Sequence, residues 1–191
     1  MYITIEGIDT AGKSTQIQRL SNIFPDAVIT KEPGGTQAGQ DIREIVLKGE
    51  VQSKKAEFLL FLADRAEHIQ EIVKPNKNKL IISDRSAISG IAYALVQKNI
   101  SKEELVALNH FATDAIYPQK AFLLKLTAEE LHYRLSQKEL DGIEKRGSDY
   151  LLKIQDAIIE AAKLLNIELV IIDATQSIET ITQEICNHID V

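Results

Sequence analysis

The chain has 191 residues, 45% of them hydrophobic, which is enough to bury a core but short for two independent domains. Its net charge of −6, from 22 basic and 28 acidic residues, argues against a nucleic-acid partner. A single cysteine, Cys186, excludes an intramolecular disulfide and favours a reducing, cytoplasmic setting. We therefore expect one domain over residues 1–191.

The chain shows no sign of a membrane partner. Its first residues lead directly into a glycine-rich loop, without the basic and apolar regions of a signal peptide. No apolar run approaches the length of a membrane-spanning helix.

Short apolar runs alternate with segments of helical length. The runs read as strands at residues 2–6, 27–31, 80–83, 121–126 and 168–172. This alternation predicts an α/β fold with a five-stranded parallel sheet. Two of these strands contain continuously apolar runs, at residues 80–82 and 169–172, which is typical of strands covered by helices on both faces. We expect a three-layer sandwich, with helices beginning at Ser101, Thr127 and Ser177.

Residues 7–14 match the phosphate-binding pattern G-x-x-x-x-G-K-[ST] between the first strand and a helical run. The glycines permit backbone angles that turn successive amides toward an anion. Lys13 is then placed to bridge the β- and γ-phosphates of ATP, and Ser14 to reach Mg²⁺. The candidate ATP-binding residues are Gly7, Ile8, Asp9, Thr10, Ala11, Gly12, Lys13, Ser14 and Thr15.

The motifs of a GTPase switch are missing. The D-x-x-G pattern occurs only at residues 9–12, inside the loop itself, and residues 76–79 lack the aspartate of N-K-x-D. The sequence therefore favours a phosphotransferase over a switch.

Asp84 and Arg85 follow the strand at 80–83, at the sheet edge where open α/β folds bind ligands. Asp84 is a candidate for Mg²⁺, through water, and Arg85 for a phosphoryl oxygen. A structural ion pair at the strand end is the alternative. Ser89 and Tyr93 are four residues apart, so a helix would present both on one face toward a nucleoside.

The helical segment 55–73 is apolar all round, which indicates burial on more than one side. Phe61 and Arg65 share one face, where the ring could stack on a base and the guanidinium could reach a base carbonyl. Core packing for Phe61 and a solvated ion pair for Arg65 are the alternatives. Phe58 and its leucine neighbours are candidates for contact with a second subunit.

Residues 32–36 read Glu-Pro-Gly-Gly-Thr and predict a tight turn after the second strand, a candidate wall of the acceptor pocket that includes Pro33. Arg43 follows on the next helix as a candidate ligand of the acceptor phosphate or as a solvated surface residue. The histidines have no metal-ligand spacing and are interpreted as structural: His68, His110, His132 and His188.

Taken in order, these motifs resemble those of bacterial thymidylate kinases across nearly the whole chain. The matching segments are residues 6–16, 32–36, 59–65, 84–85 with Ser89 and Tyr93, and 173–176. The resemblance implies the P-loop nucleoside monophosphate kinase fold, phosphorylation of dTMP by MgATP in dTTP synthesis, and a homodimer formed through helices. The rival functions are another nucleotide or metabolite kinase and a regulatory P-loop NTPase.

The resemblance also implies residue roles. Phe61 stacks on thymine, Arg65 bonds a thymine carbonyl, and Arg43 and Arg85 hold the acceptor phosphate. Tyr93 crowds the ribose 2′ position, Asp9 lies near the 3′-hydroxyl, and Ala174 lies by adenine. The catalytic candidates are Lys13, Arg85 and Asp9, and the dTMP-binding candidates are Asp9, Pro33, Arg43, Phe61, Arg65, Arg85, Ser89 and Tyr93.

The chain departs from the family pattern at three positions. Ser86 replaces the usual aromatic residue, and Gly90 replaces a polar residue that often faces the base. Thr10 stands where some members carry a P-loop arginine, so a cation from a lid at residues 136–148 is expected. The candidates for that cation are Arg134, Lys138, Lys145 and Arg146.

Overall fold

A computed structural model describes residues 1–49, 51–137 and 146–189 of the chain. In these ranges five strands form one parallel sheet in the order β2-β3-β1-β4-β5. The strands are β1 (Tyr2–Glu6), β2 (Val28–Lys31), β3 (Ile81–Asp84), β4 (Lys120–Lys125) and β5 (Glu168–Asp173). The predicted sheet is confirmed, and the predicted strand ends differ from these by at most one residue.

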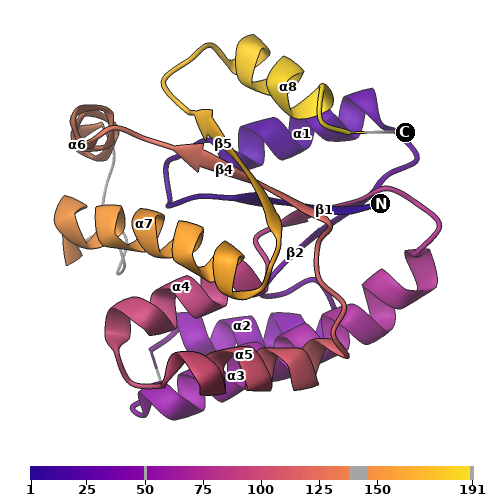
Figure 1. Ribbon diagram of the computed structural model, residues 1–191, viewed down its shortest axis with the longest axis vertical. Helices are drawn as coiled ribbons and strands as arrows, with labels where there is room; N and C mark the ends of the chain where they lie inside the picture. The colour runs from indigo at the N-terminus through magenta and orange to yellow at the C-terminus, as the bar shows by residue number, and fades with distance from the viewer. Residues whose placement is uncertain (50, 138–145, 190–191) are drawn as a thin grey trace.

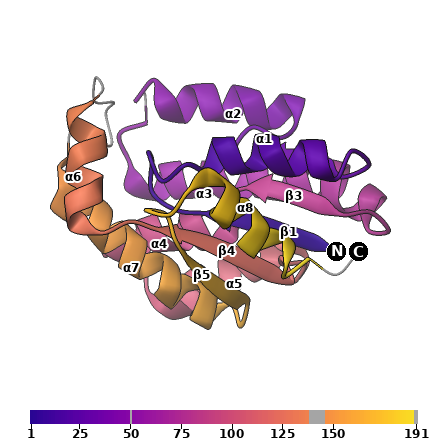
Figure 2. The same ribbon diagram turned by 90° about the horizontal axis from the view of Figure 1, so that it is seen from above.

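Helices cover both faces of the sheet, as the three-layer prediction required (Figure 1). One face carries α1 and α8, and the other carries α4, α5 and α7. In the view from above, α6 lies beside α7 at one end of the molecule (Figure 2). The helices are α1 (Lys13–Ile23), α2 (Gln37–Leu47), α3 (Lys54–His68), α4 (Ala87–Gln97), α5 (Lys102–Thr113), α6 (Ala128–Ser136), α7 (Ser148–Leu164) and α8 (Ile178–Cys186).

The helical segment predicted at 55–73 is not one regular helix. It comprises α3 and a π-helical turn at Ile69–Val73, and a 3₁₀ turn at Lys74–Asn76 follows it. Pro75 lies within the 3₁₀ turn, and because proline has no backbone N–H it cannot donate the hydrogen bond that an α-helix requires. The three predicted N-caps are confirmed, since Ser101, Thr127 and Ser177 each accept a hydrogen bond from the third residue beyond.

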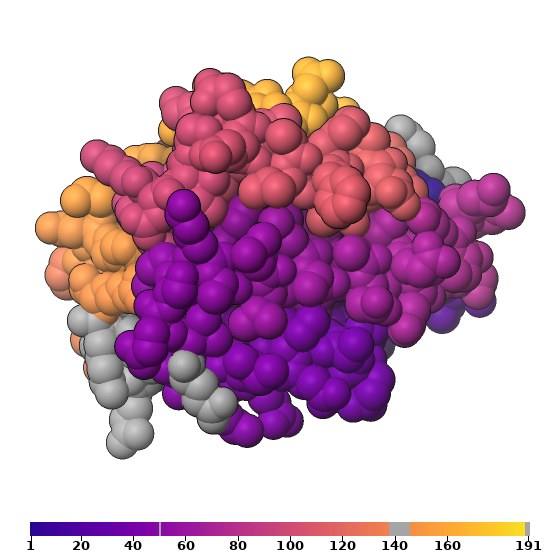
Figure 3. Space-filling model, turned by 90° about the horizontal axis from the view of Figure 1, so that it is seen from below, coloured from indigo at the N-terminus to yellow at the C-terminus, as the bar shows by residue number. Residues whose placement is uncertain are grey.

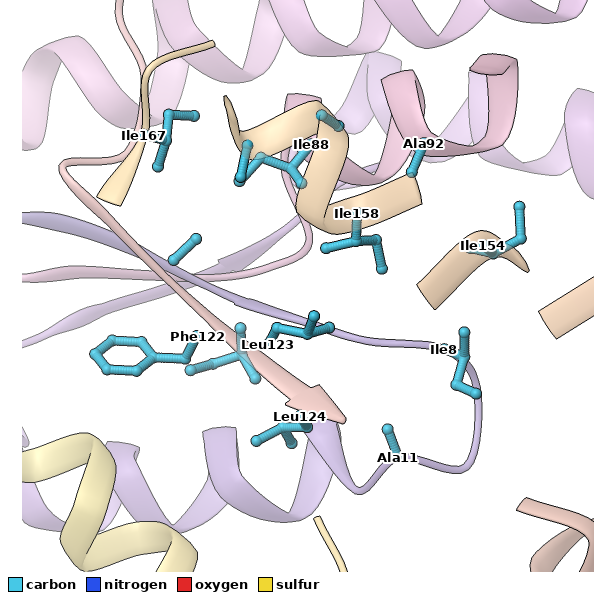
Figure 4. Packing of buried hydrophobic residues seen from close by; sticks show 14 of the residues in the cluster. Ile8, Ala11, Ile88, Ala92, Phe122, Leu123, Leu124, Ile154, Ile158 and Ile167 are labelled. Atoms are coloured by element: carbon cyan, nitrogen blue, oxygen red, sulfur yellow. The ribbon is translucent and has the colours of Figure 1, made fainter. Parts of the chain in front are cut away.

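The core lies on both sides of the central strands β1, β3 and β4. Phe122 and Leu124 of β4 are fully buried, and Figure 4 shows them in the same cluster as Ile8, Ile88 and Ile158. The predicted cover on both faces is complete for β3, whose first three residues are buried, and incomplete for β5, although α7 and α8 both contact that strand. Ile171 of β5 is 47% exposed, because β5 is an edge strand.

No helix in the described ranges is both long and apolar enough to cross a membrane.

Candidate active site

The phosphate-binding loop connects the carboxyl end of β1 to the start of α1. Gly7 has a φ of 146°, and a Cβ there would lie 3.0 Å from the Leu124 carbonyl oxygen, so glycine is required. Gly12 caps α1 in the left-handed conformation and, as a glycine, provides no side-chain acceptor for the helix amides. The first turn of α1 therefore offers its N–H groups to an anion, as expected from the sequence.

Lys13 is buried at the centre of the loop. Its Nζ donates to the Ile8 carbonyl at 3.2 Å and lies 3.7 Å from Asp9 Oδ1. Burial, with a contribution from the nearby Arg85, lowers the pKa of Lys13 to about 8. Phosphate oxygens would restore the favourable environment for its charge, so the side chain is suited to an anionic ligand.

Arg85 extends from the end of β3 to the loop. Its Nη1 donates to the Gly7 carbonyl at 3.0 Å, and its Nη2 donates to Asp9 Oδ1 at 2.7 Å. Arg85 and Thr10 both have a φ of 71°, a conformation that is strained by about 1 kcal/mol or more outside glycine. The structure therefore brings the three catalytic candidates together and holds two site residues in strained backbone.

A buried carboxylate behind the loop was not singled out from the sequence. Glu6 Oε1 accepts hydrogen bonds from Thr4 and Ser86, and Glu6 Oε2 accepts one from Ser89, whose oxygen in turn accepts from Arg85 Nη1 at 3.1 Å. Burial raises the pKa of Glu6. Ser86 also caps α4, so this departure from the family pattern contributes to the interior of the site.

The turn after β2 is fastened to α2 and α3. Asp64 Oδ1 accepts from the Gly34 amide at 2.8 Å, and Arg43 Nη1 donates to the Pro33 carbonyl at 3.0 Å. The peptide bond before Pro33 is cis. Burial raises the pKa of Asp64 to about 6. Pro33 and Arg43 are thus in direct contact.

The proposed base-binding residues lie between α3 and α4. Phe61 and Gly90 line a common cavity of about 20 Å³. Arg65 is 3% exposed and ion-paired with Glu32 at 2.9 Å, so the alternative of a solvated ion pair is wrong. Tyr93 is half-buried on α4, one turn beyond Ser89.

Arg134 lies on α6 and contacts both the phosphate-binding loop and the segment after β5. Its Nη1 donates to the Thr10 carbonyl at 2.9 Å, its Nη2 to the Ala174 carbonyl at 2.8 Å, and its Nε to Glu130 at 2.6 Å. Every guanidinium nitrogen therefore has an acceptor, and Arg134 connects the loop to the segment after β5.

The other lid candidates divide between described and undescribed residues. Arg146 is exposed beside Tyr150, with its guanidinium carbon 5.1 Å from the ring centroid. Lys138 and Lys145 lie outside the described residues, as does most of the predicted lid at 136–148.

Two candidates for magnesium lie at the same edge. Asp84 Oδ1 is buried and has no hydrogen-bond partner in the described part of the chain, and Ser14 is exposed at the start of α1. Within residues 1–49, 51–137 and 146–189, no cluster of three or more His, Cys, Asp or Glu side chains could hold a metal ion. A metal here would thus take most of its ligands from phosphates and water.

The sheet order, the phosphate loop after β1 and the arginines at the carboxyl edge define a P-loop nucleotide kinase of the nucleoside monophosphate kinase type. A family model described as thymidylate kinase matches residues 5–185. The chain belongs to the thymidylate kinase family, whose members are ATP-dependent transferases of nucleotide biosynthesis.

Named relatives agree with this family. The chain is 70% identical to the thymidylate kinase of Sulfurimonas denitrificans and 53% identical to that of Aliarcobacter butzleri, each over 191 residues and the whole of both chains. The crystal structure of thymidylate kinase from Ehrlichia chaffeensis superposes with a TM-score of 0.73 at 29% identity, covering 98% of this chain and 96% of that one.

Replacing Asp64 by asparagine should stabilise the protein at neutral pH. The amide oxygen of asparagine still accepts the hydrogen bond from the Gly34 amide. In the wild-type protein, the pKa of Asp64 is about 6 in the folded state against a usual 3.8, so the free energy of unfolding falls as the carboxyl ionises. The stability advantage of Asp64→Asn should grow by about 2 kcal/mol between pH 4 and pH 7. Urea unfolding at each pH measures it, with Asp156→Asn as the exposed control, and a pH-independent difference would contradict the assignment.

The affinity for ATP should fall above pH 8. Free Lys13 loses its proton near that pH, and binding the phosphates then requires proton uptake, so affinity declines by up to about tenfold per pH unit. Isothermal titration between pH 7 and pH 9.5 measures this. Lys13→Ala should lack the slope, and an equal slope in that variant would assign the titration to another group.

Proposed function

We propose that this chain transfers the γ-phosphoryl group of ATP to dTMP, giving dTDP and ADP, a step in dTTP synthesis. The observation that carries the proposal is the joining of Lys13, Asp9 and Arg85 at the start of α1 in a member of the thymidylate kinase family. The phosphate of dTMP attacks the γ-phosphorus in line with the departing ADP oxygen. No general base is required, because a phosphate monoester is mostly dianionic at neutral pH.

The chain's own residues then supply alignment and positive charge. The amides of residues 7–15 and Lys13 hold the ATP phosphates, and Arg85 lies between the loop and the acceptor. Asp9 fixes the orientation of Arg85 through the 2.7 Å contact. The segment at Ala174, held by Arg134, is assigned to adenine.

The acceptor pocket is assigned to the residues between the turn after β2, α3 and α4. Phe61 stacks on thymine and Arg65 donates to a base carbonyl. Arg43 binds the phosphate beside Pro33. Ser89 and Tyr93 face the sugar from α4.

Magnesium is the proposed metal. Ser14 and the unpartnered Asp84 Oδ1 would hold it, Asp84 through water, which suits a hard cation that takes oxygen ligands. When bound, it supplies charge neutralisation to the phosphoryl oxygens.

Residues 1–191 are assigned to one kinase domain, with the segment 136–148 as a lid that excludes water when both substrates are bound. The lid cation is one of Arg134, Lys138, Lys145 and Arg146. Arg134 already binds three protein acceptors, so serving as that cation would require it to exchange them.

We further propose a homodimer. Large apolar side chains are exposed on α2, α3 and α5, and Phe111 is 84% exposed. Figure 3 shows the side of the molecule on which these helices lie. Covering this surface against a second copy removes it from water. The exposed residues on these helices are Ile45, Leu47, Leu59, Leu108 and Phe111. The net charge of −6 and the single cysteine fit a cytoplasmic protein whose partners are ATP and dTMP rather than nucleic acid.

An acceptor panel tests the substrate. Purified protein with MgATP should form ADP rapidly with dTMP, and far more slowly with UMP, dUMP, AMP, CMP, GMP or no acceptor. Equal ADP formation without acceptor would indicate an NTPase, and preference for another acceptor would indicate another kinase.

The variant Lys13→Ala should retain the fold and lose turnover. Removal of one preorganised charge contact in the transition state is worth about 3–4 kcal/mol, or a 10²–10³-fold fall in kcat. Steady-state assay with dTMP measures this, beside Lys153→Ala on the exposed surface of α7 as the control. Near-normal kcat in Lys13→Ala would refute the assignment of this loop.

A further inference from the structure

Arg65 is held by two acceptors from different parts of the chain. Its Nε donates to Glu32 Oε2 at 2.9 Å, and its Nη1 donates to Asn109 Oδ1 at 2.6 Å. Glu32 follows β2, and Asn109 lies in the middle of α5. Both partners are buried, so water cannot easily replace either contact.

The Glu32 carboxylate is held from its other side as well. His68 Nδ1 lies 3.0 Å from Glu32 Oε1, and His68 Nε2 lies 2.8 Å from Thr30 Oγ1. Burial is the largest single influence on Glu32 and opposes its ionisation, but the contacts with Arg65 and His68 together outweigh it and lower the pKa of Glu32. The pair is therefore a charged contact, stronger than one between neutral groups.

Asn109 has a fixed orientation. Its Nδ2 donates to the Leu105 carbonyl at 2.7 Å, one helical turn earlier, and the side chain is fully buried. This bond leaves the amide oxygen facing Arg65. A flipped amide would instead place an N–H group against the guanidinium, and two donors cannot bond.

The third guanidinium nitrogen is directed differently. Nη2 of Arg65 has no hydrogen-bond partner among the described residues, and a Cβ on Gly90 would lie 2.8 Å from it. Gly90 lines the cavity that Phe61 also lines. The missing Cβ of Gly90 therefore leaves the space that Nη2 occupies, beside the cavity that Gly90 and Phe61 line.

We infer that Asn109 is a positioning residue, which together with Glu32 fixes Arg65 so that Nη2 alone faces the acceptor base across Gly90. This inference depends on the proposed function. Nη2 carries only N–H donors, so it favours a base edge with a carbonyl oxygen, as in thymine, and opposes one with an amino group, as in cytosine. Asn109 and Gly90 thus determine selectivity without touching the substrate's reacting atoms.

The test compares the ratio of kcat/KM for dTMP to kcat/KM for dCMP in four proteins. Asn109→Leu removes the acceptor at similar volume and should lower this ratio about 10- to 100-fold, mainly through the KM for dTMP, with the KM for ATP unchanged. Asn109→Asp keeps an oxygen toward Arg65 and should recover part of the loss. Thr113→Val, which removes another buried hydrogen bond of α5, is the matched control and should keep the wild-type ratio.

The variant Gly90→Ala tests the role of Arg65 Nη2 independently of Asn109. Its methyl group meets Nη2 at 2.8 Å, so the ratio should fall, and the double variant with Asn109→Leu should lose little beyond either single change. Additive losses, or a wild-type ratio in Asn109→Leu, would overturn the inference. If Asn109→Leu does not fold, an unchanged ratio in Gly90→Ala overturns it alone.

Different results would refute the proposed function and the positioning role of Asn109. If the wild-type protein does not phosphorylate dTMP, the proposed function is wrong. If it does, and Asn109→Leu lowers kcat equally for both acceptors at unchanged KM, Asn109 has only a structural role.

Discussion

The parallel pairing of β1 with β3 is the constraint on which the site depends. It places Ile5 beside Asp84, and the Arg85 amide donates to the Ile5 carbonyl at 3.1 Å. The phosphate loop therefore leaves β1 at the height where Arg85 leaves β3, and the guanidinium can reach both Gly7 and Asp9. A shift of register would separate the two halves of the phosphate site.

Side chains of β1 and β4 make this pairing rigid. Ile3, Ile5 and Phe122 are fully buried between the helical layers, so the strands cannot slide without exposing them. These packed strands also maintain the strained backbone conformations of Thr10 and Arg85. The packing of the core consequently fixes the geometry of the site.

Much of the fold could be predicted from the sequence. The apolar run at residues 80–82 leads into the interior strand β3, and the phosphate loop needs a fixed pattern of glycine, lysine and serine, so both leave local signals. The place of β5 could not be predicted in the same way, because an edge strand and an interior strand share the apolar run. Sheet order is decided by packing between elements far apart in sequence.

Site residues that belong to a short sequence motif could be predicted, whereas contacts between residues far apart in the sequence could not. Arg65 was identified as a base ligand or a solvated ion pair, but its partners are 33 and 44 residues away, and no pattern near Arg65 indicates Glu32 or Asn109. Arg134 was assigned to a lid, yet it contacts Thr10 across 124 residues. Ser86 was noted as a departure from the family, but its bond to Glu6 joins two strand ends.

The most direct test of the central claim is to follow the phosphorus atoms during turnover. Phosphorus NMR of the purified protein with MgATP and dTMP should show the signals of dTDP and ADP rising together, with no inorganic phosphate. Growth of inorganic phosphate while dTMP persists would contradict phosphoryl transfer to this acceptor.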